Sequence, residues 1–260
     1  MLELARVQPG SDSSAAWANL SQGGLVMGLA RTNEELEAIQ RLRYRVFTEE
    51  MNAVFPDAVD GLDADRFDPW CEHVMVKEVD TGRVVGTYRL LTPANAVKAG
   101  GYYSESEFDI ASLEALRPLM AEVGRSCIHA DYRNGSVIML LWSGIAALMQ
   151  QVGFRYVLGC ASVSLRDDGV TAAEVWRLAR KMLQKNTDLP VVRPLHRYPV
   201  ERLNSELPAR VPPLIKGYLK LGASICGEPA WDPDFNAADF PVLLDLERMD
   251  PRYRRHFGLA

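Results

Sequence analysis

The stretch from residue 119 to residue 161 limits the possible folds most, because a strand, a helix and a second strand follow one another there. An apolar run from Leu119 to Ile128 predicts a buried strand, and residues 155–161 predict another. Between them lies a polar connection at 131–135, followed by a helix whose apolar residues recur at spacings of three and four: Val137, Leu141, Ile145, Leu148 and Val152. A helix that joins two strands in this way is typical of a parallel strand pair.

A β-hairpin is predicted upstream of this unit. Residues 73–79 and 84–91 read as strands, and Asp80-Thr81-Gly82-Arg83 between them reads as a tight turn. Hairpins pair strands antiparallel, whereas the strand–helix–strand unit favours parallel pairing. The chain is therefore predicted to have an α/β fold with one central mixed sheet flanked by helices.

Other elements are predicted from helix-capping residues and from the prolines and glycines that bound helices. Residues 24–30 predict a first strand, and Thr32 with Glu35 forms a capping box for a helix. A second capping box is expected at Thr171 and Glu174. Pro212-Pro213 and Gly222 bound a further helix, and late strands are predicted at 190–195, 224–227 and 242–246. Residues 1–24 are expected to form a flexible N-terminal arm, and residues 25–260 one domain.

Charge and cysteine content reduce the number of possible functions. The net charge of −5 disfavours nucleic acid as a partner, because nucleic-acid proteins present basic surfaces. The four cysteines form no CxxC pair, so we expect reduced thiols and no metal site. No signal peptide is recognisable, and the apolar stretch 136–154 contains polar residues and glycines that fit a core helix better than a membrane span. A cytoplasmic location is expected.

Glu122 and Arg125 lie inside an otherwise apolar predicted strand, where unpaired charges are costly. They either form an ion pair that fastens the core or act in catalysis, with Glu122 as the base that receives the proton of an attacking amine. Their odd spacing places them on opposite faces of a regular strand. A bulge near Gly124 would let both side chains reach one cleft.

The connection Asp131–Ser136 precedes the N-terminus of the long helix, which suits an anion. The alternative is a surface turn. A basic stretch, Arg43-Tyr44-Arg45, precedes a long loop at 52–69 that contains five aspartates. These charges either form solvated faces or make a lid whose carboxylates hold a cationic substrate. Arg89, on the hairpin, is expected to pair with one of these aspartates.

Six segments of the sequence are distinctive: 42–47 (LRYRVF), 86–91 (GTYRLL), 122–129 (EVGRSCIH) with Tyr132-Arg133, 159–162 (GCAS), 212–219 (PPLIKGYL) and 232–236 (DPDFN). Through these segments, and over residues 25–257, the chain resembles the ornithine lipid N-acyltransferases, which have a GNAT-like fold. The resemblance implies transfer of a 3-hydroxyacyl chain from acyl carrier protein to the α-amine of ornithine, giving a lyso-lipid.

The same features are similar to those of acyl-homoserine lactone synthases. On this resemblance we expect Glu122 and Arg125 to be catalytic, and the substrate-binding residues to be Arg45, Asp63, Asp65 and Arg89. The group that would hold the donor's phosphopantetheine phosphate is Arg133, Gly135, Ser136 and Val137. This loop departs from the Gly-x-Gly pattern of coenzyme A-dependent GNAT enzymes, so we expect acyl carrier protein as the partner and no tightly bound cofactor.

Two rival functions stay open from the sequence. One is an acyl-homoserine lactone synthase that uses S-adenosylmethionine, and the other is a GNAT-like module that binds acyl carrier protein without catalysis. An amphiphilic product also suggests peripheral contact with the inner membrane face through Leu214, Ile215, Tyr218, Leu219, Lys216 and Lys220. The alternative for that segment is a helix packed on the core.

Overall fold

The computed structural model describes residues 21–56, 58–203, 207 and 209–259. This part of the chain contains the following strands: β1 (Ser21–Gln22), β2 (Leu25–Leu29), β3 (Glu72–Glu78), β4 (Val84–Leu91), β5 (Phe108–Asp109), β6 (Met120–Ile128), β7 (Tyr156–Ser164), β8 (Arg193–Pro194), β9 (Ser224–Ile225), β10 (Ala230–Asp232) and β11 (Ala237–Asp245). Its α-helices are α2 (Asn33–Met51), α3 (Pro93–Ala99), α4 (Ser104–Glu107), α5 (Ser136–Val152), α6 (Val170–Lys185), α7 (Pro213–Leu221) and α8 (Pro251–His256).

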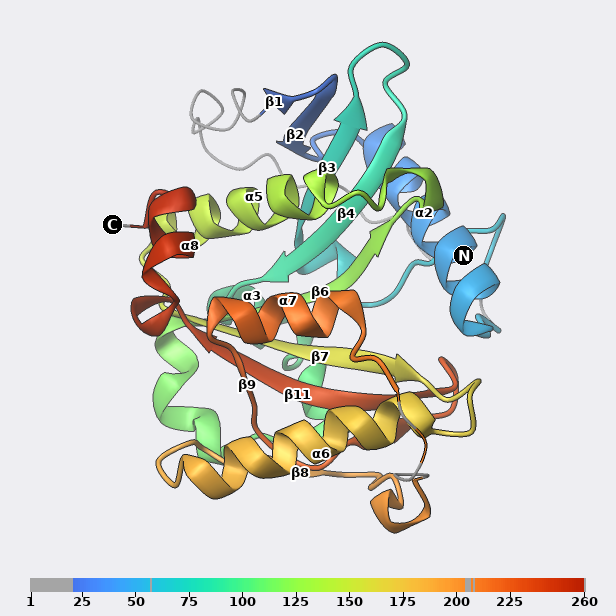
Figure 1. The fold of residues 1–260 in the computed structure, drawn as a ribbon. Helices are drawn as coiled ribbons and strands as arrows, with labels where there is room; N and C mark the ends of the chain where they lie inside the picture. Colours follow the sequence, from blue (N-terminus) through green and yellow to red (C-terminus); the bar gives the residue numbers. More distant parts are fainter. Residues whose placement is uncertain (1–20, 57, 204–206, 208, 260) are drawn as a thin grey trace.

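One sheet runs through the molecule in the order β1–β2–β3–β4–β6–β7–β11–β10, with β9 paired to β11 (Figure 1). β6 and β7 are parallel, and the other neighbours in this sheet are antiparallel. The prediction of a mixed sheet is confirmed. β5 and β8 form a separate two-stranded sheet.

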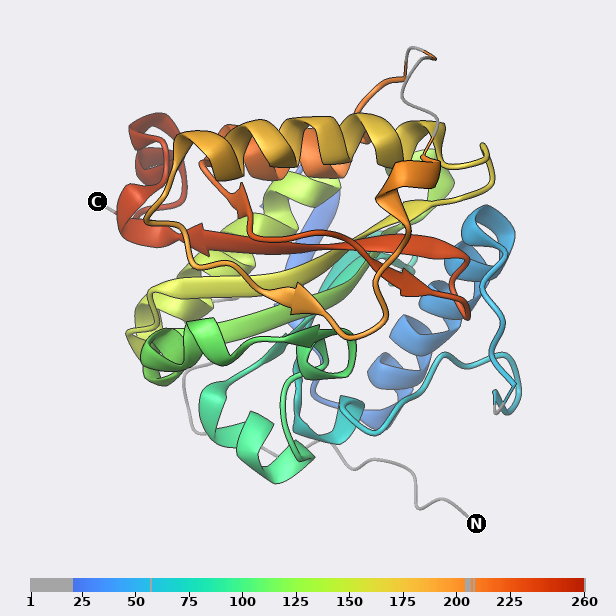
Figure 2. The ribbon, with the colours of Figure 1, turned by 90° about the horizontal axis from the view of Figure 1, so that it is seen from below.

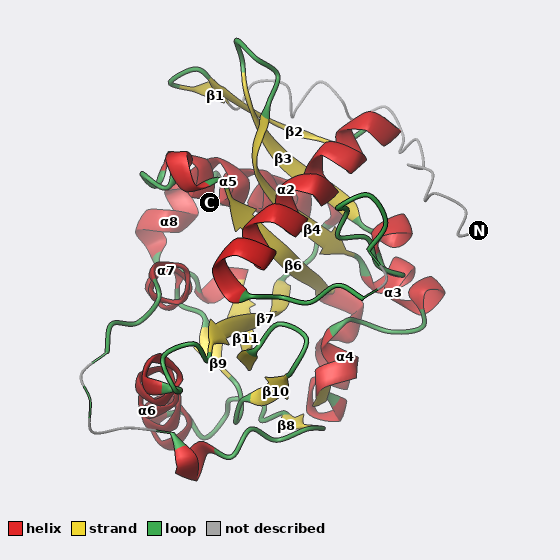
Figure 3. Ribbon diagram, turned by 90° about the vertical axis from the view of Figure 1, so that its right-hand side faces the viewer, coloured by secondary structure: helices red, strands yellow, loops and turns green. Residues whose placement is uncertain are grey.

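Helices cover both faces of the sheet. Val74 and Val76 of β3 pack in the core with α5, whereas Met75 between them packs in the core with α2. Because successive strand residues point to opposite faces, α2 and α5 lie on opposite sides of the sheet (Figures 1 and 3). The α5 side also carries α6 and α7, while the segment 93–119 covers the α2 side (Figure 2).

The predicted caps agree with the structure at one helix and differ at another. Thr32 accepts a hydrogen bond from the backbone N–H of Glu35 at 3.2 Å, so α2 begins as predicted. The capping box expected at Thr171 is wrong, because α6 begins at Val170 after Gly169, whose φ is 81°. The N–H of Thr171 instead donates to the Asp167 carboxylate at 2.9 Å.

Several elements gave no periodic signal in the sequence. Residues 93–119 form α3, α4, β5 and a run of 3-10 helix at Ala111–Leu119, and none of these was predicted. β11 begins five residues before the predicted strand at 242, and β10 was not predicted. Of the predicted arm at 1–24, residues 1–20 lie outside the described part, and residues 21–24 form β1 and its turn into β2. None of the described helices is both long and apolar enough to cross a membrane.

Candidate active site

The bulge expected near Gly124 is present in β6. Arg89 of β4 lies opposite Gly124, whereas Thr87 lies opposite Cys127, so β6 has one more residue than β4 between these pairs. Arg125 lies in this bulge and has a φ of 50°, a left-handed conformation that non-glycine residues rarely adopt. The bulge brings the Glu122 and Arg125 side chains to the same cavity, although their spacing is odd.

This cavity opens where β6 and β7 separate. The two strands pair only from Met120 to Glu122 and from Tyr156 to Leu158, although each has nine residues. The cavity has a volume of about 260 Å³ and is lined from β6, β7, β11, α5 and α7. Its wall requires glycine at position 159, because a Cβ there would lie 2.8 Å from the backbone oxygen of Val123.

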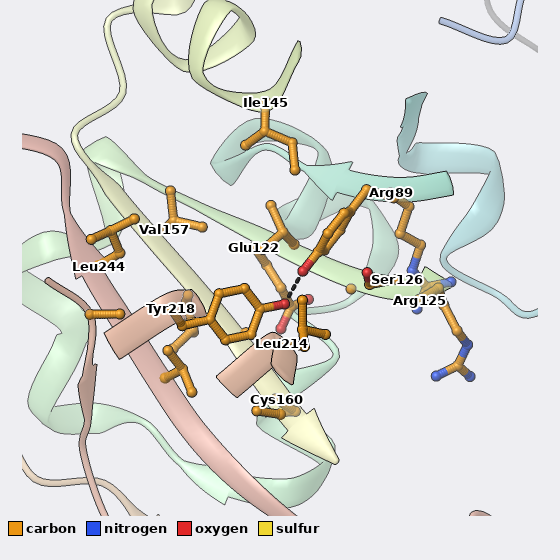
Figure 4. A pocket seen from close by; sticks show the side chains of 18 of the residues that line it. Arg89, Glu122, Arg125, Ser126, Ile145, Val157, Cys160, Leu214, Tyr218 and Leu244 are labelled. Atoms are coloured by element: carbon orange, nitrogen blue, oxygen red, sulfur yellow. Dashed lines mark hydrogen bonds between the residues drawn. The ribbon is translucent and has the colours of Figure 1, made fainter. Parts of the chain in front are cut away.

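Glu122 is held by a segment that the sequence patterns did not reveal. Its carboxylate accepts hydrogen bonds from the N–H of Tyr103 at 2.7 Å, the N–H of Ser104 at 2.7 Å and the Ser104 hydroxyl at 2.5 Å. The side chain is buried yet lines the cavity (Figure 4). Burial raises the pKa of Glu122 and the hydrogen bonds from Ser104 and Tyr103 oppose that rise. A fixed carboxylate with a raised pKa suits a general base.

Asp68 is the centre of a buried ion cluster next to the cavity, and the sequence analysis did not select it as a site residue. Arg43 donates to both of its carboxylate oxygens at 3.0 and 2.8 Å, Arg89 donates at 2.9 Å, and Gln40 donates at 2.9 Å. Attraction to Arg43 and Arg89 outweighs desolvation and holds the pKa of Asp68 well below its usual range. The Asp68 carboxylate therefore stays ionised and fastens α2 to β4.

Arg125 connects this cluster to the cavity. Its Nε lies 3.4 Å from the Asp63 carboxylate and its Nη2 lies 3.2 Å from that of Asp65. The guanidinium carbon is 5.2 Å from the ring centroid of Tyr103 and 4.9 Å from that of Phe235. The Nε faces Asp63, while the guanidinium group of Arg125 lines the cavity and can bind an anionic group there.

The prediction for Arg45 is wrong, because its side chain is exposed on α2 and Arg43 occupies the inward position. Arg43 donates to Asp63 at 2.9 Å and is itself completely buried. The reason is helical geometry: Ile39, Arg43 and Val46 follow one stripe at spacings of four and three, whereas Arg45 lies on the other side of the helix. Extending the apolar stripe through Arg43 would have found the correct residue.

The predicted pairing of Arg89 with the aspartate-rich loop is confirmed. Arg89 lines the cavity and donates to Asp65 at 2.6 Å as well as to Asp68. Asp63 and Asp65 do not line the cavity, since their carboxylates point at arginines. In the structure the loop is thus fastened by Arg43, Arg89 and Arg125.

Away from the charged residues, the cavity becomes apolar. Figure 4 shows Ile145, Val157 and Leu244 around this end, and further residues that line it are Leu246, Met249 and Phe257. Leu214, Ile215 and Tyr218 of α7 form one wall, where the Tyr218 hydroxyl is hydrogen-bonded to that of Tyr88. These three residues thus pack inward, as in the core-packed alternative for this helix, while Lys216 and Lys220 are exposed.

The predicted phosphate-binding loop lies outside this cavity. Arg133 is exposed, donates to the backbone oxygen of Ile128 and is paired with Glu50. Gly135 precedes α5 with a φ of 97°, and the Ser136 N–H donates to Asn134 at 3.0 Å. Val137 is fully buried, and its methyl group would lie 2.4 Å from a Cβ at Gly86. Val137 therefore contributes to the core through its side chain and to an anion site only through its N–H.

Cys160, which also lines the cavity, does not have the environment of a nucleophile. Burial and the nearby carboxylates of Asp239 and Glu122 raise the pKa of its thiol well above the usual value. The thiol therefore stays protonated at neutral pH. The described residues contain no group of three or more side chains that could hold a metal ion.

Replacing Asp68 with asparagine is expected to lower the free energy of unfolding by about 3–5 kcal/mol, because two buried arginines lose a shared partner. Urea unfolding at neutral pH measures this, with Asp60→Asn at an exposed position as the matched control. Because folding lowers the pKa of Asp68, its contribution is present above the ordinary value of 3.8 and is lost as the pH falls below it. The gap between wild type and variant should therefore shrink in acid, and a constant gap would contradict this account.

Comparison with known proteins agrees with this geometry. Residues 42–143 match the family model described as an acetyltransferase (GNAT) domain. FeeM, an N-acyl amino acid synthase from uncultured soil microbes, has a TM-score of 0.52 at 14% identity, covering 86% of this chain and 91% of that one. TofI, solved in a ternary complex with an inhibitor and MTA, has a TM-score of 0.51 at 13% identity, covering 91% and 97%. The fold, with this domain, defines an acyltransferase of the GNAT class.

Curated relatives narrow the class further. The L-ornithine N(alpha)-acyltransferase of Brucella abortus (strain 2308) is 38% identical over 256 residues, which cover 91% of this chain and 89% of that protein. The protein of the same name from Agrobacterium fabrum (strain C58 / ATCC 33970) is 36% identical over 251 residues, covering 91% and 86%. The chain belongs to the family of L-ornithine N(alpha)-acyltransferases.

Proposed function

We propose that this acyltransferase moves a 3-hydroxyacyl chain from an acyl carrier protein thioester to the α-amine of ornithine, giving a lyso-ornithine lipid. The observation that carries the proposal is the single cavity in which the Glu122 carboxylate and the β6 bulge meet a long apolar end. An amine and a thioester can meet at the polar end, while the acyl chain occupies the apolar end. The name of the curated relatives supports ornithine as the acceptor.

In this proposal Glu122 takes a proton from the α-ammonium group, directly or through one water molecule. The free amine attacks the thioester carbonyl and a C–N bond forms. The nitrogen then loses its second proton to solvent, and the C–S bond breaks. The carrier thiol leaves, and the proton held by Glu122 passes to its sulfur. No covalent enzyme intermediate is needed, which fits the protonated state of Cys160.

The β6 bulge supplies the second component of the proposed mechanism. A bulge leaves backbone N–H groups outside the regular ladder, and one of them can hold the carbonyl oxygen as negative charge develops. The guanidinium group of Arg125, which lines the cavity, would donate hydrogen bonds to the carboxylate of the amino acid. The bulge and Arg125 lie on the same strand as Glu122, so this one strand fixes their positions relative to the base.

The donor's phosphate is assigned to the N-terminus of α5, where Arg133, Gly135, Ser136 and Val137 gather. A helix of 17 residues presents free N–H groups and the positive end of its dipole there. Arg133 would have to exchange its Glu50 partner for the phosphate.

The experiment on the donor compares 3-hydroxyacyl carrier protein with the corresponding coenzyme A thioester at equal concentration, with ornithine as acceptor. A higher kcat/KM with the carrier supports acyl carrier protein as the donor, and a preference for coenzyme A would overturn that part of the proposal.

A Ser104→Ala variant is expected to shift the pH profile without removing catalysis. Activity needs ionised Glu122, so kcat/KM falls as the pH drops through its pKa, and burial places that limb above the ordinary value of 4.5. The Ser104 hydroxyl lowers this pKa, so its loss should move the acidic limb to higher pH. Profiles from pH 4 to 9 test this, with Ser106→Ala at an exposed position as control; an unmoved limb would contradict the role of Glu122 as the titrating base.

The two rival functions are outcomes of the same assays. Lactone formation that requires S-adenosylmethionine would favour an acyl-homoserine lactone synthase, and carrier binding without turnover would favour a non-catalytic module.

Peripheral membrane contact is proposed for the exposed side of α7, where Lys216 and Lys220 would face anionic lipid. Co-sedimentation with anionic vesicles, compared with neutral vesicles, tests this contact.

A further inference from the structure

Two carboxylates, Asp232 and Asp239, line the cavity from the hairpin of β10 and β11. In this hairpin Asp232 lies opposite Ala237, and Ala230 lies opposite Asp239. Because residues two apart on a strand share a face, Asp232 and Asp239 project from the same face as diagonal neighbours. No role in the proton transfer or in donor binding has been assigned to either of them.

Asp239 is the more unusual of the two. Its exposed fraction is 1%, and its Oδ1 has no hydrogen-bond partner among the described residues. A buried carboxylate oxygen without a partner is costly, so its position in the wall of a cavity indicates that a ligand supplies the missing donor. Asp232 is better satisfied, since its Oδ1 accepts from the N–H groups of Asp234 and Phe235 at 3.0 Å each.

The local charge balance also points to a cation. Burial, followed by repulsion from Asp232, raises the pKa of Glu107 and of Asp239 to about 7, and Glu107 adds to the repulsion at Asp239. The nearby cation is Arg125, whose guanidinium already faces Asp63 and Asp65. The three carboxyl groups of Glu107, Asp232 and Asp239 therefore lack an arginine of their own, in contrast to the balanced cluster around Asp68.

Tyr103 relates this acidic group to the base. Its backbone N–H donates to Glu122, while its hydroxyl lies 3.5 Å from the Glu107 carboxylate and in the electrostatic field of Asp239 and Asp232. Tyr103 thus contacts Glu122 with its backbone and the acidic group with its side chain. An acceptor in the cavity can therefore meet both the base and a second negatively charged group.

We propose that Asp239, with Asp232 beside it, binds the side-chain ammonium group of a diamino acid acceptor and so selects it over neutral amino acids. The inference rests on the proposed function, in which Glu122 receives the proton of the α-amine. The same cavity would then distinguish acceptors that carry a second positive charge from acceptors that do not. The terminal ammonium supplies the donor that the Asp239 Oδ1 lacks, and its charge keeps the carboxylates ionised.

The test compares ornithine with norvaline, which has the same carbon chain and lacks the terminal amine. With 3-hydroxyacyl carrier protein as donor, wild type should prefer ornithine by about 100-fold or more in kcat/KM, because norvaline leaves Asp239 unpaired. In Asp239→Asn this preference should fall below about tenfold, through loss of activity with ornithine and little change with norvaline. Asp188→Asn, at an exposed position outside the cavity, is the matched control and should keep the wild-type preference.

Each outcome separates this inference from the function on which it rests. Equal wild-type activity with ornithine and norvaline, or an unchanged preference in Asp239→Asn, overturns the inference while the acyltransferase function stands. Acylation of no amino acid at all overturns the proposed function. If Asp239→Asn fails to fold, the wild-type protein still decides, since ornithine must raise its Tm more than norvaline does at equal concentration.

Discussion

Replacing Glu122 with glutamine is expected to lower kcat about 100- to 10,000-fold, because the variant has no base to receive the proton of the amine. Glutamine keeps the size of the side chain, and its amide oxygen can keep the two hydrogen bonds from Ser104, whereas the bond from Tyr103 goes to the other carboxylate oxygen and is lost. A melting curve checks that the variant is folded, and in a folded variant the KM for the acceptor should change little. Steady-state kinetics with ornithine and acyl carrier protein measure both constants.

The control for this variant is Glu49→Gln, an exposed glutamate at the end of α2. It should behave as wild type. Turnover by Glu122→Gln at the wild-type rate would remove Glu122 from the mechanism. A rise in KM with unchanged kcat would instead assign Glu122 to acceptor binding.

An Ala146→Leu substitution in α5 is expected to shorten the acyl chain that the enzyme accepts. Ala146 is buried and lines the cavity, so a larger side chain fills space that we assign to the acyl chain. If three methylene groups lose their place, at about 0.8 kcal/mol each, the ratio of kcat/KM for long over short donors falls by tens of fold. A series of carrier-bound acyl chains of increasing length measures this ratio.

Gln151→Phe is the control on the same helix, since residue 151 is exposed and does not line the cavity. It should leave the chain-length profile unchanged. A melting curve of Ala146→Leu checks that overpacking has not unfolded the protein. An identical profile for a folded Ala146→Leu variant would place the acyl chain elsewhere.

Local periodicity predicted most of the elements that build the site. The strand that carries Glu122, the following helix α5 and the hairpin that carries Arg89 all have strong apolar patterns, and all three are present. The bulge at Arg125 followed from chemistry, since two charged residues at odd spacing could share a cleft only if β6 was irregular. These inferences succeeded because they depend on neighbours along the chain.

The parts that the sequence did not predict depend on contacts between distant segments. Ser104 and Tyr103 belong to a region without an apolar period, and their N–H groups meet Glu122 only after the chain has folded. The buried position of Arg43 depends on which face of α2 meets the sheet. Asp239 lies in a stretch of β11 whose alanines and aspartate gave no strand signal, so neither its burial nor its free oxygen could be anticipated.

We expect one cavity to bring an amino acid amine and a carrier-bound acyl chain together for direct transfer. The most direct measurement incubates the purified protein with 3-hydroxyacyl carrier protein and a panel of amino acids, and follows free carrier thiol together with product mass. We predict that thiol is released only in the presence of an acceptor, most rapidly with ornithine, and that an N-acyl amino acid appears in equal amount. Carrier binding without thiol release for any acceptor, or a product that forms only with S-adenosylmethionine, would contradict it.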